Sequence, residues 1–190
     1  MKKVLVLVSA LLILALGTSI VSAQNPFVQV YFSHPVWGTP DGTNLTQCPP
    51  GAPGTVLDSL YVIAHNFNMW MSAIEYQVLY PATIFFLSDN TGAPLNVGNS
   101  SIGIATAWPL PQNAFTQLVV NKVLFIYMCQ FCYEGTNIPI DVVPHPDTGF
   151  VRAVRWPDNA VITAQGMRSL ICGTTPVEET TWGNIKALYE

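Results

Sequence analysis

The sequence predicts an all-β fold, a single antiparallel β-sandwich of about nine strands. Clusters of Gly, Pro, Asn and Asp recur roughly every ten residues, which is the spacing of turns in such a fold. The segments between these clusters are rich in Val, Ile, Thr and aromatic residues, which favour extended backbone. No segment with helical periodicity longer than about two turns occurs before residue 176. These observations favour strands joined by turns.

Nine segments have the composition of strands. In chain order they cover residues 27–32, 60–65, 72–80, 83–87, 101–108, 119–133, 137–143, 150–154 and 160–163. Turn-forming clusters separate them, and the longest such cluster is the proline-rich segment 34–54. Gly103 weakens the signal of the segment that contains it, because glycine disfavours extended backbone. Pro81 separates the third segment from the fourth.

Two of these segments also predict which side chains are buried. Residues 72–80 alternate, with Ile74, Tyr76, Val78 and Tyr80 on one face and Glu75 and Gln77 on the other. That pattern is typical of a strand with one face on the core. Residues 119–133 are apolar on both faces, so this strand is predicted to lie centrally, between two sheets or under a covering loop.

The first 23 residues have the organisation of a secretory signal peptide. Lys2 and Lys3 are followed by an apolar run over residues 4–16, which is too short to span a bilayer, and then by a small-residue cleavage site ending at Ala23. The mature chain is therefore predicted to begin at Gln24. We expect three segments: the signal peptide 1–23, the sandwich domain 24–172, and a linker with a short tail, 173–190.

Charge and hydropathy argue against nucleic-acid binding and against a transmembrane segment in the mature chain. Without Lys2 and Lys3, 5 of the 7 basic residues remain against 11 acidic ones, a formal charge of −6. Such a surface disfavours nucleic acid, whose phosphates require clustered Lys and Arg. No second apolar run reaches about 18 residues, so no transmembrane segment is predicted after cleavage. The expected location is outside the cytoplasm: extracellular, at the cell surface or periplasmic.

Four cysteines in an exported chain predict two disulfide bonds, with three pairings open. They are Cys48, Cys129, Cys132 and Cys172. Cys129 and Cys132 form a C-x-x-C motif, but no βαβ pattern surrounds it, so we favour a structural role over a redox or metal role. In an extended strand these two side chains would point to opposite faces. We therefore expect Cys48 and Cys172 each to pair with one member of the motif.

The tail differs in kind from the rest of the chain. Residues 175–179 form a polar linker, and residues 181–189 predict a short amphipathic helix. Trp182, Ile185 and Leu188 share one face of that helix. A helix this short is not stable alone, so it requires a surface on which to dock. That surface is either its own sandwich or a partner.

The tail also carries a resemblance. The run Pro176-Val-Glu-Glu-Thr-Thr-Trp-Gly-Asn-Ile-Lys-Ala-Leu-Tyr189 resembles the ending of small secreted uncharacterised proteins from environmental bacteria, and residues 142–149 and 152–154 resemble internal parts of them. This resemblance implies export and a sandwich fold. More distantly, residues 60–65 and 73–81 look like the opening strands of cohesin-like modules. That likeness implies an immunoglobulin-like or cohesin-like jelly roll.

Metal-binding and catalytic motifs are weak in this sequence. His34, His65 and His145 do not have the spacing of a zinc site. Oxygen-rich turns at 41–44, 89–92 and 147–149 resemble calcium loops without matching their full spacing. No G-x-S-x-G segment surrounds a serine, and no pair of carboxylates can be assigned to a cleft. We predict no metal site, no cofactor other than the alternative of calcium, and no enzyme activity.

The aromatic residues supply the remaining candidate site. Four tryptophans lie at predicted turns or strand ends, where side chains are often partly exposed: Trp37, Trp70, Trp108 and Trp156. They either stack on a sugar ligand or close the ends of the core.

The sequence as a whole predicts an exported, non-catalytic module with a structural, adhesive or protein-interaction role at or beyond the cell envelope. Its partner would be a second copy or another envelope protein, reached for example by strand addition. One alternative is a carbohydrate- or calcium-binding extracellular module. The other is an extracellular thiol–disulfide protein that uses Cys129 and Cys132.

Overall fold

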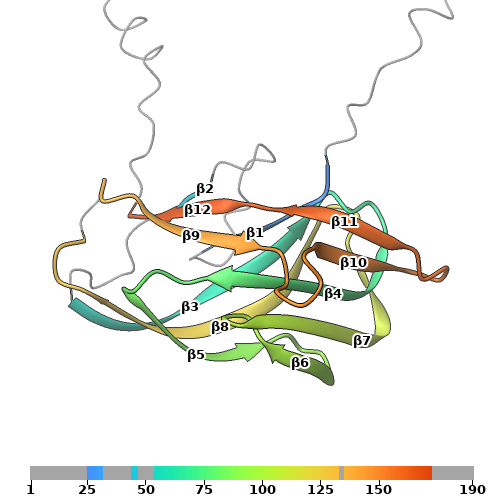
Figure 1. The fold of residues 1–190 in the computed structure, drawn as a ribbon, viewed down its shortest axis with the longest axis horizontal. Helices are drawn as coiled ribbons and strands as arrows, with labels where there is room; N and C mark the ends of the chain where they lie inside the picture. Colours follow the sequence, from blue (N-terminus) through green and yellow to red (C-terminus); the bar gives the residue numbers. More distant parts are fainter. Residues whose placement is uncertain (1–24, 32–43, 47–53, 133–134, 173–190) are drawn as a thin grey trace, which may run out of the picture.

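The computed structural model describes residues 25–31, 44–46, 54–132 and 135–172, and in these ranges the regular structure is β-strand only (Figure 1). The strands are β1 (Phe27–Tyr31), β2 (Asn44–Thr46), β3 (Gly54–His65), β4 (Trp70–Leu79), β5 (Ile84–Asn90), β6 (Leu95–Asn99), β7 (Gly103–Asn113), β8 (Gln117–Cys129), β9 (Ile138–Val143), β10 (Val151–Trp156), β11 (Val161–Gly166) and β12 (Arg168–Ile171). No helix long and apolar enough to cross a membrane occurs in these ranges. The predicted signal peptide and helical tail lie outside the described residues.

The strands form a β-sandwich, as predicted, from one continuous hydrogen-bonded ladder that folds over on itself. One layer has the order β5–β8–β3–β1 and is called the β8 sheet below. A parallel pairing joins β1 to β11, and the ladder continues as β11–β10–β4–β7–β6, called the β4 sheet. β9 pairs with the second half of β4, and β12 pairs with β9.

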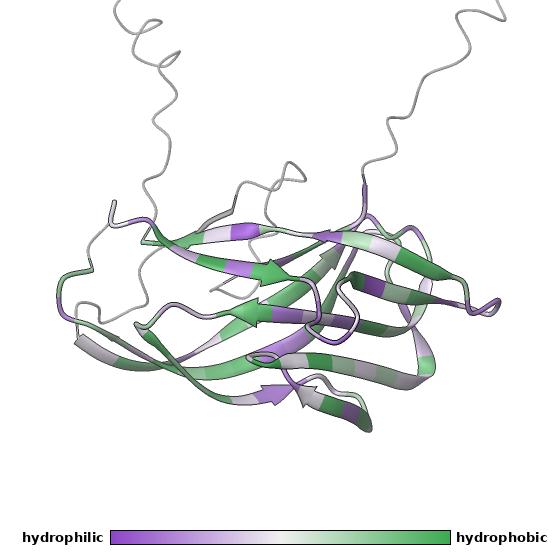
Figure 2. Cartoon of the chain, in the orientation of Figure 1, coloured by the Kyte–Doolittle hydropathy of each residue, from purple (hydrophilic) through white to green (hydrophobic). Residues whose placement is uncertain are grey.

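The core lies between the two sheets. β8 contributes Val123, Phe125 and Tyr127, which are fully buried. β4 contributes Ile74, Tyr76 and Val78, which are also buried, while Glu75 and Gln77 between them stay partly exposed. This confirms the half-buried strand predicted from the alternation. Figure 2 shows hydrophobic residues along most strands and hydrophilic ones in turns such as the one between β10 and β11.

The prediction that β8 is covered on both faces is wrong. β8 is central in its sheet, because β3 and β5 pair with its two edges. Its outward side chains, however, are exposed: Leu124 and Met128 remain accessible to solvent. Apolar residues on both faces of this strand therefore produce an apolar outer surface rather than a second buried layer.

The structure has strands that the sequence did not predict. β2, β6 and β12 are short, and β6 contains Gly98 in a left-handed conformation, so each has a weak strand signal. β3 begins at Gly54, well before the predicted start at residue 60, and β7 continues to Asn113 through two prolines. The expected number of about nine is therefore too low: twelve strands occur in the described part of the chain.

Candidate interaction surface

The outer face of the β4 sheet carries a row of apolar residues that crosses five strands. Cross-strand pairing aligns, in order over β6, β7, β4, β10 and β11, the residues Leu95, Ala107, Ala73, Val154 and Val161. Residues directly opposite each other in antiparallel strands point to the same side of the sheet. Leu95 and Val161, at the two ends, are 60% and 56% exposed. We call these five residues the apolar row.

The next outward row is mixed. It aligns, over the same five strands, the residues Val97, Ala105, Glu75, Arg152 and Thr163. Arg152 Nε lies 2.6 Å from Glu75 Oε1, and the Thr148 hydroxyl donates a hydrogen bond to the same oxygen. Both contacts fall on the same carboxylate oxygen of Glu75. The row is apolar on β6 and β7, and polar from β4 onward.

Between these residues the surface forms a shallow groove of about 280 Å³. Its floor is made by Ala73, Ala105 and Ala107, whose side chains are short. Leu95 and Val97 on β6 form one wall, and residues of β10 and β11 form the other. The hollow follows from this sequence pattern, because alanine on the two central strands leaves room that larger residues on the outer strands enclose.

An aromatic pair borders the apolar row. Trp70 on β4 and Trp156 on β10 are directly opposite each other, and they are 45% and 50% exposed. Phe115 contacts the Trp70 ring edge-on, with ring centroids 6.1 Å apart. The structure therefore brings together two of the four tryptophans that the sequence singled out. They extend the apolar surface along β4 and β10.

The other two tryptophans do not join this surface. Trp108 packs against the core, and its indole N–H donates to the backbone carbonyl of Thr91 over 3.3 Å. It therefore has the structural role of closing the core. Trp37 lies outside the described residues, as do Trp182, Ile185 and Leu188 of the tail.

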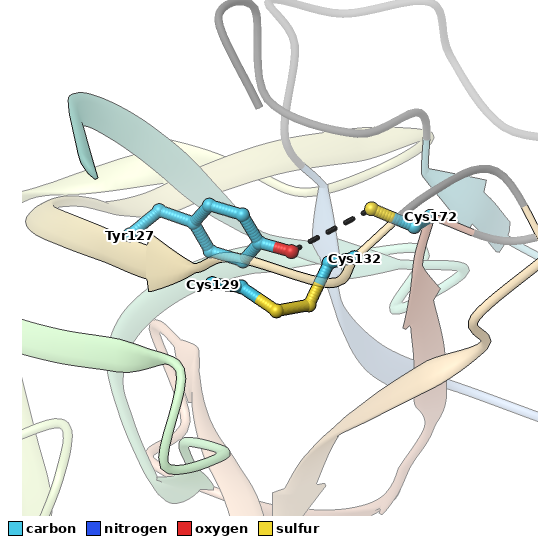
Figure 3. The surroundings of a disulfide bond; sticks show 4 residues. All are labelled: Tyr127, Cys129, Cys132 and Cys172. Atoms are coloured by element: carbon cyan, nitrogen blue, oxygen red, sulfur yellow. Dashed lines mark hydrogen bonds between the residues drawn. A yellow bond between two sulfur atoms is a disulfide. The ribbon is translucent and has the colours of Figure 1, made fainter. Parts of the chain in front are cut away.

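The cysteines pair differently from the prediction. Cys129 and Cys132 form a disulfide bond with each other, so the scheme in which each pairs with Cys48 or Cys172 is wrong. The reason is that β8 ends at Cys129 and the chain then bends. The side chains of Cys129 and Cys132 therefore do not point to opposite faces, as they would in a continuous strand. Cys172 is also disulfide-bonded, and Cys48 lies outside the described residues. The Cys172 sulfur lies 3.6 Å from the Tyr127 hydroxyl. Figure 3 shows the two groups pointing toward each other.

The described histidines are buried side chains in separate places. His65 stacks on the ring of Phe27 and bonds the hydroxyl of Tyr31, whereas His145 lies in the loop before β10. Burial lowers the pKa of His65 to about 4. His34 is outside the described residues. Within the described part of the chain, no group of three His, Cys, Asp or Glu side chains has the arrangement of a metal site.

The turn at 89–92 is held by a polar network. Both carboxylate oxygens of Asp89 accept hydrogen bonds: one from the Ser100 N–H at 2.7 Å, the other from the Ser100 hydroxyl at 2.7 Å and the Asn121 amide at 2.6 Å. The Tyr80 hydroxyl bonds Ser100 in turn. Burial raises the pKa of Tyr80 well above its ordinary value. This network fixes the end of β5 on β8 and the loop after β6.

The outer face of the β8 sheet offers a comparison. Leu57 on β3, Ile126 on β8 and Phe85 on β5 are aligned by the cross-strand register. Leu57 and Phe85 are 64% and 57% exposed. This face is apolar as well, but its central side chains are large, whereas the centre of the β4 sheet is lined by alanine.

Most residues of the groove were not singled out by the sequence. Leu95 and Val97 belong to β6, which had no strand signal. The alanines were not recognised either, because alanine gives no sequence signal for a binding site. The signal that would have found them is the cross-strand register, which becomes visible only when the strands are paired. The mixed row was partly visible, because Glu75 was predicted to face outward on β4.

No protein-family model matches this sequence, and no curated protein sequence matches it. Solved structures do resemble the chain. Several of them are cohesin modules.

Two examples cover 84% of this chain. The non-cellulosomal cohesin from the archaeon Archaeoglobus fulgidus is 10% identical, matches over 97% of its length and has a TM-score of 0.46. The type III cohesin module of the scaffoldin ScaE from Ruminococcus flavefaciens is 7% identical, matches over 93% of its length and has a TM-score of 0.49. At these identities the likeness does not extend to site residues or activity.

Proposed function

We propose that the protein is an exported, non-catalytic protein-binding module that receives its partner on the outer face of the β4 sheet. The observation that carries this proposal is the apolar row across five strands, whose two end residues are more than half exposed and whose three central residues are partly exposed. A contiguous exposed apolar surface of this kind is typical of an interaction site. The Glu75–Arg152 ion pair and Thr163 form a polar border beside it, as at the rim of a protein interface.

The dimensions of the groove favour a protein over a small molecule. At about 280 Å³, the groove is at or below the lower end of the range typical of small-ligand pockets, roughly 300–1,000 Å³. It is instead the size that one or two large side chains fill. Trp70 and Trp156 beside it add aromatic area, which is enriched at protein interfaces.

The placement at or beyond the cell envelope rests on residues 1–23 and on the cysteines. Disulfide bonds persist mainly in oxidising compartments, and the bond between Cys129 and Cys132 supports such a location. The partner is then a second copy of the chain or another exported protein.

A photo-cross-linking experiment tests the proposal. Val97 on the groove wall and Leu57 on the β8 sheet have similar exposure, 63% and 64%, so benzoylphenylalanine at each position makes a matched pair. We expect a defined protein, identified by mass spectrometry from the exported fraction of the source cells, to be captured from position 97 and not from position 57. Equal capture from both positions, or none from position 97, would contradict the proposal.

A second candidate function is carbohydrate binding. It is favoured by one observation, the half-exposed pair of Trp70 and Trp156 opposite each other on neighbouring strands. Calorimetric titration with a panel of oligosaccharides tests it, with Trp156→Ala as the variant that removes one ring. Absence of heat for every oligosaccharide, or binding that survives Trp156→Ala, would exclude a site built on this pair.

A further inference from the structure

We propose that two copies of the protein associate back to back through the outer faces of their β8 sheets. This face lies on the opposite side of the sandwich from the groove, so the inference does not depend on the proposed function. Its occupant is a second copy of the same chain. Three properties of the face support this: its apolar area, its charge, and the sizes of the side chains that the strand register aligns.

The face exposes enough apolar area for a stable dimer. Large apolar side chains project outward from β3, β8 and β5, and four of them are 37–64% exposed: Leu57, Phe85, Leu124 and Met128. At roughly 100 Å² each, they expose about 400 Å² per copy, or about 800 Å² for two copies. Homodimer interfaces are about 65% apolar, so this area corresponds to a total of about 1,200 Å², which is enough for a specific interface.

Charge favours a second copy over a charged partner. Four outward rows are aligned across β3, β8 and β5 between positions 122 and 128 of β8, and Lys122 is the only charged side chain among their aligned residues. The predicted mature chain carries more acidic than basic residues, so two copies repel each other over most approaches. None of the acidic residues belongs to these rows. The face is therefore a side on which two copies can meet with little repulsion.

Two neighbouring rows on this face complement each other in size. The outer members of one row are large, and its residues are Leu57, Ile126 and Phe85. The outer members of the next row are small, and its residues are Ser59, Leu124 and Ser88. A two-fold axis that crosses the strands between these rows places each row of one copy over the other row of its partner. The large side chains at positions 57 and 85 then project over serines, and Ile126 packs on Leu124.

The other two-fold axis, which runs along β8, is disfavoured. It places Leu57 over Phe85 and Lys122 over the same lysine of the second copy. The axis across the strands instead keeps the two Lys122 side chains at opposite ends of the interface, about 20 Å apart. This exceeds the screening length of about 10 Å at 0.1 M salt. Size and charge therefore favour the same arrangement, in which the β8 strands of the two copies run antiparallel to within about 30°.

This dimer leaves the grooves of both β4 sheets on its two outer sides. Combined with the proposed function, it presents two binding surfaces, so a partner with repeated binding elements would be held with avidity. A probe at position 57 then links to a second copy of the chain, which is a different product from the partner captured at position 97. Loss of the dimer leaves the affinity of each groove unchanged, because the grooves lie on the other face.

Sedimentation equilibrium of the full mature chain, over a range of concentrations, tests the dimer. We expect the mass of two chains. Leu57→Arg places a guanidinium in the apolar interface and should raise the dissociation constant of the dimer at least about tenfold. Val97→Arg, at a position of similar exposure on the groove wall, should leave that constant unchanged. Thermal unfolding confirms that both variants are folded.

Photo-cross-linking tests the arrangement, with benzoylphenylalanine in place of Phe85 and a mixture of isotopically light and heavy chains. We expect links between light and heavy chains, in chymotryptic peptides that contain β5 or β8. Three results would overturn the inference: a single-chain mass at every concentration, a dissociation constant that folded Leu57→Arg does not change or that Val97→Arg raises equally, or links between copies that fall mainly on β3 or on the β4 sheet. A single-chain mass would leave the proposed function standing, since that function is tested by partner capture at position 97.

Discussion

His65 is a titratable side chain in a site that disfavours its charged form. It is 2% exposed, stacks on Phe27 with ring centroids 4.5 Å apart, and shares a hydrogen bond of 2.9 Å with the Tyr31 hydroxyl. Tyr31 also donates to the buried amide oxygen of Gln29. Removal from water therefore lowers the pKa of His65 from 6.5 to about 4.

This shift predicts a loss of stability in mild acid. The unfolded chain binds a proton at His65 as the pH falls through 6.5, whereas the folded chain does so only near pH 4. The contribution of neutral His65 is complete above pH 6.5 and falls by about 3 kcal/mol by pH 4. Urea unfolding of the wild type and of His65→Gln at pH 7 and pH 4 measures this. The difference in the free energy of unfolding between the wild type and His65→Gln should change by about 3 kcal/mol between pH 7 and pH 4. A difference in this free energy that does not vary with pH would refute the prediction.

At the scale of elements, the strands differ in how well the sequence predicts them. β4 was predicted, with its buried face, because every second residue is large and apolar and one face lies on the core. β6 was missed because it is an edge strand that pairs only with β7 in the described chain, and its Leu95 and Val97 face solvent. The groove depends on β6, so it could not be found from periodicity. The register between paired strands determines which residues line the groove, and this register is a property of the folded chain.

The junction of β11 and β12 makes a second testable element. A Cβ atom at Gly166 would overlap the backbone carbonyl of Val142, which is part of β9. Gly166→Ala must therefore move two strands apart, and we expect it to lower the free energy of unfolding by about 1–3 kcal/mol. Gly92→Asn is the control, since nothing lies within 4 Å of a Cβ there and Asn tolerates its positive φ. Equal free energies of unfolding for Gly166→Ala and the wild type in denaturant would refute the close approach of Gly166 to the backbone of Val142.

At the scale of the molecule, the sandwich presents two apolar outer faces with different relief. The β8 sheet exposes large side chains at its centre, such as Ile126 between Leu57 and Phe85. The β4 sheet is hollow at its centre because Ala73, Ala105 and Ala107 lie between larger residues. A hollow receives a protruding partner side chain in a desolvated pocket, which is where binding energy concentrates in interfaces. This difference is why we assign the partner to the β4 sheet.

The central claim is tested most directly by the affinity of the captured partner for variants of each face. Calorimetric titration of the purified partner compares the wild type with Ala105→Arg, which fills the groove, and with Leu57→Arg, which alters the β8 sheet. Thermal unfolding confirms that each variant is folded. We predict that Ala105→Arg weakens binding at least tenfold and that Leu57→Arg leaves it unchanged. Unchanged affinity of folded Ala105→Arg, or an equal loss in Leu57→Arg, would contradict the claim that the groove of the β4 sheet receives the partner.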